Sequence, residues 1–361
     1  MTDIKDVRLG VVGLGNIATL HCNRLESAGL ASVIAGGVDV DPDAREEFSE
    51  EYDVPTYADR EQLYDNVDAV LVTTPNKFHE EYVVGALEAG LDVFVEKPLA
   101  HTVESAERIA AAAGEAEGFC MVGFHNRFRN PVQALVGYRD DGTLGEVSHV
   151  EADYIRRRGI PGRGSWFTRR DVSGGGSLID IGVHAVDLSL YLLGFPEVVE
   201  VTGQTRAQFG TDEDYAYVDM WGEDQGADAF SVDDSVSAFV RCADGSTVTL
   251  EVAWAANRPD SQQYYVRGKD GGAGLDLAED ALELYETVGG EVNHHRTTEV
   301  ETQRGDAHGA ITKRFLEAVA AEDPPETNTV SQALTVQRVL DAIYRSSERG
   351  GSVRLDESRK V

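Results

Sequence analysis

A short apolar run followed at once by a glycine turn and a helical pattern constrains the fold of this chain more than any other feature. The run is Val7-Arg8-Leu9-Gly10-Val11-Val12, the turn is Gly13-Leu14-Gly15-Asn16-Ile17-Ala18, and residues 21–28 have a helical pattern. This order brings main-chain N–H groups to the beginning of a helix, where they suit a pyrophosphate. A glycine turn that only permits tight packing is the alternative.

The segments that follow alternate between strand and helix. We predict strands at 32–38, 69–73, 92–95 and 119–123, and helices at 46–52, 80–89 and 103–113. Buried strands that alternate with helices predict a doubly wound parallel sheet, whose ligand lies beyond the carboxyl ends of the strands. Asp39 follows the second strand, where an acid can accept both ribose hydroxyls of NAD. Val40 and Asp41 suit a 2′-phosphate poorly, so we favour NAD over NADP.

Two further motifs follow strands of this predicted sheet. Thr74-Pro75-Asn76 follows one strand, with His79 shortly afterwards, and Glu96-Lys97-Pro98 follows the next. Pro98 keeps Lys97 out of helical geometry, and a lysine there suits a hydrogen bond to a reacting hydroxyl beside a nicotinamide. The alternative is a surface pair of Glu96 and Lys97 with little energetic value.

A second glycine-rich stretch, Gly174-Gly175-Gly176, precedes a predicted helix over 177–193. On that helix Asp180, His184, Asp187 and Tyr191 recur at spacings of four, three and four, so they share one stripe. The other faces are apolar, which describes a helix packed on most sides. Burial of these acids and of His184 is costly without partners, so the stripe either lines a polar site or forms a satisfied core network.

The second half of the chain has a different pattern. A basic loop, Arg156–Arg170, contains six arginines and Trp166, which offers a stacking face. The arginines either hold a carboxylate or phosphate of a ligand, or neutralise acids at a subunit contact. Alternating strands are predicted at 146–154, 198–209, 235–242, 247–254, 262–268 and 281–285, with helices at 307–321 and 329–349. Short turns between adjacent strands predict an antiparallel sheet.

Charge is the strongest compositional signal in the 361 residues. The chain has 64 acidic and 32 basic residues, a net charge of −32, which disfavours nucleic acid and anionic membranes as partners. Acids scattered along the chain are typical of a halophilic protein, whereas an acidic protein from a low-salt cell is the alternative. The beginning is unlike a signal peptide, and three separated cysteines indicate a reducing compartment, so we expect a cytoplasmic protein without a metal site.

Together these motifs resemble the Gfo/Idh/MocA family, named for glucose-fructose oxidoreductase and inositol dehydrogenase. The resemblance rests on the turn at 13–18, on Thr74-Pro75-Asn76 with His79, on Glu96-Lys97-Pro98, on residues 123–128 and on residues 174–184. It implies an NAD-binding Rossmann domain over 1–128. It also implies a substrate-binding α/β domain over 129–361, with a large, open, mostly antiparallel sheet through which a homodimer or homotetramer forms. Ala18 in place of the third glycine is tolerated by the family.

The resemblance also implies roles for single residues. The catalytic set is Lys97, His184 and Asp180. The cofactor set is Gly13, Gly15, Asn16, Ile17, Asp39, Thr74, Pro75, Asn76, His79, Glu96 and Lys97. The substrate set is Lys97, Arg127, Arg157, Trp166, Asp180 and His184. The acidic segment Thr211–Asp233 looks like an insertion, so substrate contacts there do not transfer from the family.

We therefore hypothesise an NAD(P)-dependent oxidoreductase that moves hydride between a ring hydroxyl of a sugar, sugar acid or cyclitol and the nicotinamide. An NAD-dependent glycoside hydrolase of the same fold is one alternative, and net formation of NADH distinguishes the two. A non-catalytic sensor that binds NAD or sugar is a third possibility, which the joint presence of Lys97, Asp180 and His184 disfavours.

Overall fold

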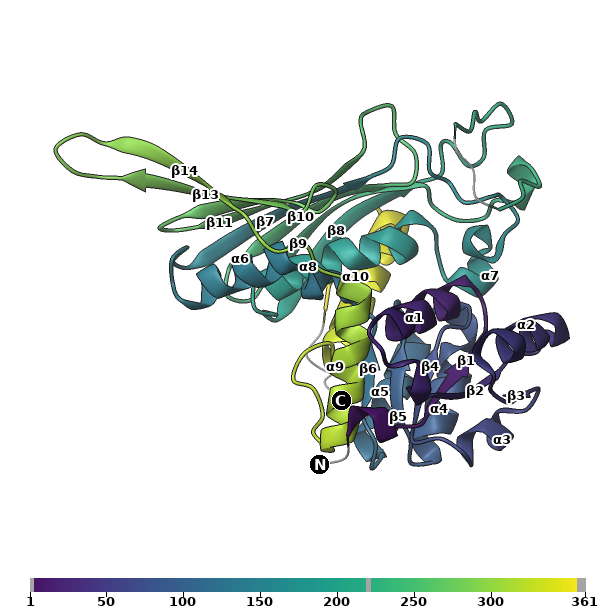
Figure 1. Cartoon of the computed structure of the whole chain (residues 1–361). Helices are drawn as coiled ribbons and strands as arrows, with labels where there is room; N and C mark the ends of the chain where they lie inside the picture. Colours follow the sequence, from purple (N-terminus) through teal and green to yellow (C-terminus); the bar gives the residue numbers. More distant parts are fainter. Residues whose placement is uncertain (1–2, 219–221, 356–361) are drawn as a thin grey trace. The chain divides into compact units, whose positions relative to one another are not determined.

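The computed structural model describes residues 3–218 and 222–355, which form two compact units (Figure 1). The first unit contains the described residues up to His125 together with 306–337, and the second contains those of 126–305 and those from Arg338 onward. From the sequence, the boundary is expected at residue 128, with 129–361 in the second domain. The structure instead groups residues 306–337 with the first unit.

A six-stranded sheet forms the centre of the first unit, in the order β3-β2-β1-β4-β5-β6, and every neighbouring pair is parallel. The strands are β1 (Leu9–Val12), β2 (Ile34–Val38), β3 (Thr56–Tyr57), β4 (Ala69–Val72), β5 (Asp92–Val95) and β6 (Cys120–Val122). All residues of β1 and β4 are buried, as continuous apolar strands require. The predicted doubly wound parallel sheet is confirmed, and its order reverses between β1 and β4, where such sheets bind ligands.

The helices that connect these strands begin where their sequences supply caps. They are α1 (Asn16–Ser27), α2 (Pro42–Tyr52), α3 (Arg60–Tyr64), α4 (His79–Glu88) and α5 (Val103–Glu115). The Asp41 side chain accepts a hydrogen bond from the Asp43 N–H, and Pro42 occupies the first turn of α2. Thr102 caps α5 in the same way through the Ser105 N–H. These contacts fix the helix starts beside the carboxyl ends of the strands.

A late segment of the chain returns to the first unit. Helix α9 (Ala307–Ala321) brings Phe315 edge-on to Phe94 and Phe119, with ring centroids 5.6 and 5.7 Å apart. Asn328 then donates through Nδ2 to the carbonyl oxygens of Val122 and Phe124, at 2.8 and 3.2 Å. Helix α10 (Val330–Arg349) follows. The return therefore covers the β5–β6 side of the sheet with apolar and hydrogen-bonding contacts.

The second unit is built on a nine-stranded sheet in the order β14-β13-β12-β11-β7-β10-β9-β8-β15. Its strands are β7 (Val147–Ile155), β8 (Val198–Arg206), β9 (Ser235–Cys242), β10 (Thr247–Ala253), β11 (Ser261–Gly268), β12 (Gly272–Asp276), β13 (Ala281–Val288), β14 (His294–Val300) and β15 (Val353–Arg354). Only the pair of β7 and β10 is parallel among these described strands. The predicted large, mostly antiparallel sheet is confirmed.

Helices cover one face of this large sheet. Helices α6 (Asn130–Asp140) and α8 (Val183–Leu192) lie on the same side (Figure 1). On β7, Val150 and Ala152 are buried whereas the intervening Glu151 is exposed, as period-two alternation requires. The other face carries Phe239 and Tyr265, which are 43% and 47% exposed.

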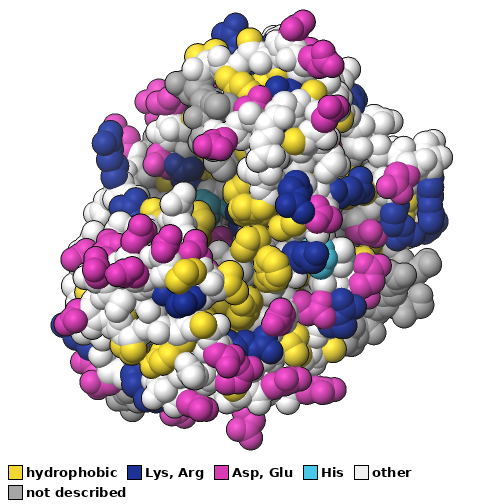
Figure 2. Space-filling model, turned by 90° about the vertical axis from the view of Figure 1, so that its right-hand side faces the viewer, with side chains coloured by type: hydrophobic (Ala, Val, Ile, Leu, Met, Phe, Trp, Pro, Cys, Tyr) yellow, Lys and Arg dark blue, Asp and Glu magenta, His cyan; other side chains and the backbone are white. Residues whose placement is uncertain are grey.

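Acidic side chains are spread over the molecular surface. Figure 2 shows Asp and Glu side chains scattered across the visible face, with Lys and Arg side chains between them. This distribution agrees with the even spread of acids along the sequence. None of the described helices combines the length and apolar character that a membrane span requires.

Candidate active site

The glycine turn after β1 presents an open helix N-terminus. Gly13 has a φ of 86°, and a Cβ there would lie 2.9 Å from Cγ2 of Thr74, so this position requires glycine. Helix α1 begins after Gly15, whose position offers no side-chain cap. A Cβ at Gly15 would meet nothing within 4 Å. The first N–H groups of α1, which include those of Asn16 and Ile17, thus fit a pyrophosphate.

Asp39 ties the end of β2 to this turn. Its Oδ2 accepts the Leu14 N–H at 2.8 Å and its Oδ1 accepts the Asp41 N–H at 2.9 Å. A carboxylate has about four acceptor positions, so two remain for ribose hydroxyls. Arg45 also reaches this place, because its Nη1 donates to the Asp39 carbonyl oxygen at 2.7 Å. Arg45 belongs to no motif of the sequence, so its place here was not predicted.

His79 joins the two motif loops of the first unit. Its side chain is buried, and its ring nitrogens each lie 2.9 Å from a carbonyl oxygen, Nδ1 from Pro98 and Nε2 from Thr74. Burial lowers the pKa of His79, although both carbonyl groups favour a proton. Since both nitrogens are engaged by main chain, His79 would serve a cofactor by holding the loops that carry Pro75, Asn76 and Lys97.

Glu96 and Lys97 follow β5 at the carboxyl edge of the sheet. Oε2 of Glu96 accepts the Lys97 N–H at 3.1 Å, and Oε1 accepts a hydrogen bond from Nε2 of His21 at 2.8 Å. Burial opposes ionisation of Glu96. The His21 hydrogen bond and the positive charges of His21, His125 and Lys97 outweigh burial and lower the pKa of Glu96 to about 2. Lys97 itself is half-buried, so its ammonium group can meet a ligand.

In the second unit, the predicted helix over 177–193 consists of two parts. A π-helical turn, Leu178–Gly182, precedes α8 (Val183–Leu192). Single π turns in helices are frequent at functional sites. Because a π turn changes the angular spacing of side chains, the predicted stripe does not continue evenly from Asp180 to Tyr191.

Asp233 fixes the N-terminal end of this helical segment. Its Oδ1 accepts the Gly176 N–H and the Tyr344 hydroxyl, at 2.9 and 2.6 Å. Its Oδ2 accepts the Ser177 hydroxyl and the Leu178 N–H, at 2.8 and 2.9 Å. A Cβ on Gly176 would lie 1.9 Å from the Asp233 carbonyl oxygen, so only glycine permits this approach. The acid therefore caps the segment that carries Asp180 and His184.

Asp180 and His184 occupy successive turns of that segment. Oδ2 of Asp180 accepts the indole N–H of Trp254 at 3.0 Å and lies 3.8 Å from a guanidinium nitrogen of Arg156. The Asp180 side chain is 13% exposed, and His184 is 6% exposed. An indole N–H and a nearby guanidinium orient the Asp180 side chain, which can in turn support a neighbouring base.

Arg127 and Asp187 form a buried ion pair. Nε and Nη2 of Arg127 donate to the two carboxylate oxygens of Asp187 at 3.0 and 2.5 Å, and both side chains are 1% exposed. The guanidinium also lies over the rings of Tyr191 and Phe195, 4.9 and 4.7 Å from their centroids. These contacts engage the guanidinium of Arg127, which the family resemblance assigns to substrate, and they pair it with Asp187.

The basic loop binds the acidic segment of the same chain. Arg163 is buried and donates through Nε and Nη2 to Asp224, both at 2.8 Å, and through Nη1 to the Asp212 carbonyl oxygen at 2.7 Å. Arg158 lies over the rings of Phe209 and Tyr215. At least part of the basic loop thus neutralises acids of 211–233, of which residues 219–221 lie outside the described residues.

The remaining residues of the basic loop are more open. Arg157 is exposed, and its main-chain N–H donates to Asp260. Trp166 is half-buried and stacks on Phe167 with ring centroids 3.8 Å apart. Among the described residues, no group of three His, Cys, Asp or Glu side chains has the arrangement that a metal ion needs.

The motifs of the first unit meet at one edge of its sheet. Gly13, Asp39, Thr74 and Lys97 follow β1, β2, β4 and β5, which are parallel. The contacts of His21, Asp233 and Trp254 were not predicted from the sequence. His21 could have been noticed as a histidine within the first helix. Asp233 is one of 64 acidic residues, and nothing in its local sequence distinguishes it. Trp254 stood out only as the last residue of an alternating strand.

Two family models match the chain. The "Oxidoreductase family, NAD-binding Rossmann fold" model matches residues 7–124, and the "GFO/IDH/MocA C-terminal domain" model matches residues 132–273. The matched ranges contain the glycine turn and Lys97 in the first case, and Asp180 and His184 in the second.

Characterised proteins are similar over most of the chain. D-glucoside 3-dehydrogenase of Escherichia coli is 32% identical over 290 residues, 80% of this chain and 79% of that protein. D-xylose 1-dehydrogenase (NADP(+)) 2 of Haloferax volcanii is 26% identical over 357 residues, 96% of this chain and 98% of that protein. The structure of levoglucosan dehydrogenase with NADH and levoglucosan superposes with a TM-score of 0.83 at 20% identity, covering 97% of this chain and 100% of that chain, a likeness of fold.

Proposed function

The chain belongs to the Gfo/Idh/MocA family of NAD(P)-dependent oxidoreductases, and we propose that it transfers hydride between a ring hydroxyl of a sugar, sugar acid or cyclitol and NAD. One observation carries the proposal. The carboxyl edge of one parallel sheet carries three features: the glycine turn at Gly13, which suits a pyrophosphate, Asp39, which suits a ribose, and Lys97. This edge is where a doubly wound sheet holds a dinucleotide.

We propose separate tasks for the residues that meet the reacting alcohol. When bound, NAD supplies the hydride acceptor. Lys97 donates a hydrogen bond to the alcohol oxygen, which orients the oxygen and stabilises negative charge on it. His184 accepts the hydroxyl proton, and Asp180 keeps His184 oriented from a position that Trp254 and Arg156 fix. General base help of this kind contributes roughly 10²- to 10⁴-fold to a rate.

Substitution of these residues tests the assignment. The wild-type enzyme is incubated with NAD and a panel of sugars, sugar acids and inositols in molar KCl, and NADH absorbance is followed. We expect Lys97→Ala and His184→Ala to lower turnover by roughly 10²-fold or more, with NAD affinity retained. Wild-type turnover in either variant would remove that residue from the mechanism. Product formed without net NADH would indicate a hydrolase.

We further propose that the protein works in the cytoplasm of a halophile. A net charge of −32 destabilises the compact chain by self-repulsion. At 1 M salt the Debye length is about 3 Å, so most of this repulsion is screened. The unfolding midpoint in urea should therefore rise between about 0.1 M and about 2 M KCl. A midpoint that is independent of salt, or falls with it, contradicts this part of the proposal.

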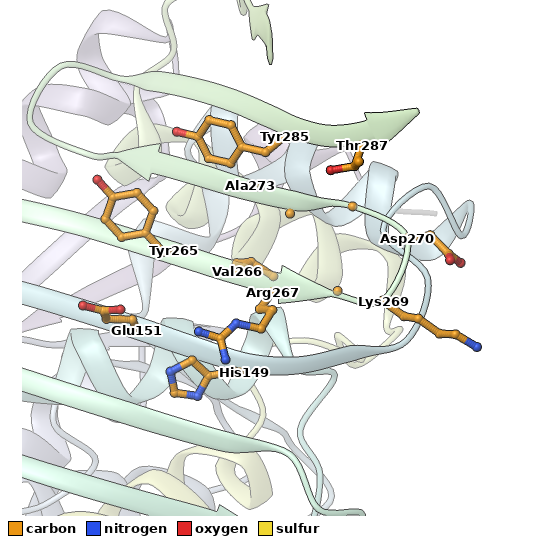
Figure 3. A pocket seen from close by; sticks show the side chains of 13 residues that line it. His149, Glu151, Tyr265, Val266, Arg267, Lys269, Asp270, Ala273, Tyr285 and Thr287 are labelled. Atoms are coloured by element: carbon orange, nitrogen blue, oxygen red, sulfur yellow. The ribbon is translucent and has the colours of Figure 1, made fainter. Parts of the chain in front are cut away.

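We also propose that subunits associate through the open face of the large sheet, as a homodimer or homotetramer. Phe239 and Tyr265 are exposed there, and a hollow nearby is lined by His149, Glu151 and Arg267 (Figure 3). Light scattering after gel filtration should give a multiple of 39.2 kDa. The double variant Phe239→Asp/Tyr265→Asp should give the monomer mass, because it places charges at the centre of this face.

A further inference from the structure

A buried series of hydrogen bonds links helix α9 to the main chain of Lys97. The Thr312 hydroxyl on α9 lies 2.8 Å from Nδ1 of His21 on α1. Nε2 of His21 donates to Oε1 of Glu96 at 2.8 Å, and Oε2 of Glu96 accepts the Lys97 N–H at 3.1 Å. His21 and Thr312 are essentially inaccessible to solvent. We propose that His21 is a positioning residue, which sets the place of Lys97 by holding the Glu96 carboxylate; this inference rests on the proposed catalytic role of Lys97.

The surroundings of Glu96 leave its carboxylate little freedom. Its N–H donates to the Val72 carbonyl oxygen at 2.9 Å, which fixes its main chain to the end of β4. A Cβ on Gly123 would lie 2.9 Å from the carboxyl carbon of Glu96, so Gly123, the residue after β6, packs directly against the carboxyl group. With one oxygen on His21 and the other on Lys97, rotation of the carboxylate would break both hydrogen bonds.

Several charged or titratable groups face this series. Those near Glu96 are His21, His79, Lys97, His125 and His308. The rings of His125 and His308 stack with centroids 3.8 Å apart, and the ring of His308 meets His21 edge-on at 6.1 Å. Asp306 and Arg24 lie beyond His308. Within this group His21 donates a side-chain hydrogen bond to Oε1 of Glu96, and the charges of His125 and Lys97 also act on this carboxylate.

Loss of His21 changes the charge state that Glu96 prefers. Burial favours the protonated form of a carboxyl group, and a hydrogen bond from an imidazole opposes this. Without His21, Glu96 takes up a proton at a higher pH, and its hold on the Lys97 N–H weakens. Since misplacement of a reacting group by about 1 Å costs about 10²-fold in rate, the defect should appear in turnover.

Polar and apolar variants of His21 separate positioning from packing. Gln at 21 places an amide N–H where Nε2 lies and reaches Glu96, whereas Asn reproduces Nδ1 and reaches only Thr312. We expect His21→Leu and His21→Asn to lower kcat by roughly 10- to 100-fold with the KM for NAD within about twofold. In both variants kcat should fall further as the pH is lowered from 8 toward 5, roughly the range in which a buried carboxyl without its partner titrates.

His21→Gln should restore kcat to within roughly fivefold of wild type and remove the additional fall at low pH. Adding Glu96→Gln to His21→Leu should also remove that fall, because no carboxyl is left to titrate, while kcat stays low. Cys22→Ala is the packing control, since Cys22 is a buried neighbour on α1. It should lower the unfolding temperature and leave the pH profile unchanged. If His21→Leu does not fold, the comparison of the Asn and Gln variants gives the same readout.

Two results would overturn the inference. One is a wild-type kcat and pH profile in His21→Leu or His21→Asn, and the other is an equal defect in His21→Gln and His21→Asn. Lys97→Ala measured alongside separates this inference from the proposed function. An inactive Lys97→Ala with a normal His21→Asn refutes only the positioning role, whereas a fully active Lys97→Ala refutes the catalytic assignment and the positioning role with it.

Discussion

Trp254 donates its indole N–H to Oδ2 of Asp180 at 3.0 Å, so a fully buried residue at the end of β10 orients the acid that precedes His184. Phe at 254 keeps most of the ring and removes this donor. We expect Trp254→Phe to lower kcat roughly tenfold, because a hydrogen bond to a charged group contributes about 1.5–3 kcal/mol. NAD affinity, measured by fluorescence titration, should not change. Tyr64→Phe, which removes an aromatic hydrogen-bond donor outside the proposed site, is the control, and an equal loss there would contradict the prediction.

The pair of Arg127 and Asp187 predicts a loss of stability. Arg127→Met leaves a carboxylate that is 1% exposed without its cation, which costs roughly 3–5 kcal/mol. The double variant Arg127→Met/Asp187→Leu should recover most of that loss, because no buried charge remains. Urea unfolding of the three proteins measures both values. If Arg127 instead binds substrate, Arg127→Met should raise the substrate KM with little change in the unfolding midpoint.

The contact of Arg163 with Asp224 predicts local opening in acid. The Arg163 hydrogen bonds lower the pKa of Asp224 from 3.8 to about 2, although partial burial opposes them. A carboxyl with a lowered pKa stabilises the fold fully above its unfolded value, and this contribution is lost as the pH falls from 3.8 toward 2. The amide protection factors over 211–218 and 222–233, measured by hydrogen exchange, should therefore fall in that range. Arg163→Ala should show fast exchange already at neutral pH, whereas Arg169→Ala, which loses only an exposed pair, should not.

Asp39 predicts the choice between NAD and NADP. Asp39→Asn retains an oxygen for the Leu14 N–H but removes the charge that repels a 2′-phosphate, and Arg45 lies beside it. We expect kcat/KM for NADP to rise roughly tenfold and that for NAD to fall, with the unfolding temperature nearly unchanged. Arg45→Ala in the Asp39→Asn background should cancel the gain. An unchanged ratio of the two cofactors would show that Asp39 does not face the ribose.

The sequence predicted the architecture well where local pattern decides it. Buried apolar strands between helices predicted the parallel sheet, and alternation predicted most strands of the second sheet. The strands β12 and β14 were missed because Gly272 and Gly274 weaken the first pattern and the second is almost wholly exposed. The π turn over Leu178–Gly182 was missed because helical spacing in sequence does not reveal one extra residue in a turn.

Residues of the candidate site were likewise predicted where local sequence decides their place and missed where distant parts of the chain meet. Residues in motifs, such as Gly13, Asp39 and Lys97, were found because their place after a strand fixes their surroundings. Partners brought from far along the chain were not found. Asp233 reaches Gly176 across 57 positions, and Thr312 reaches His21 across 291. Only tertiary packing determines which of many acids or hydroxyls makes such a contact.

The return of residues 306–337 has a consequence for synthesis of the protein. Until residues 306–337 have been synthesised, Phe315 cannot cover Phe94. The hydrogen bonds from Asn328 to the end of β6 are also missing until then. A ribosome therefore releases nearly the whole second unit before the first is complete. The dinucleotide unit, although encoded first, finishes folding late, and a chain that stops at residue 305 leaves it with an uncovered apolar surface.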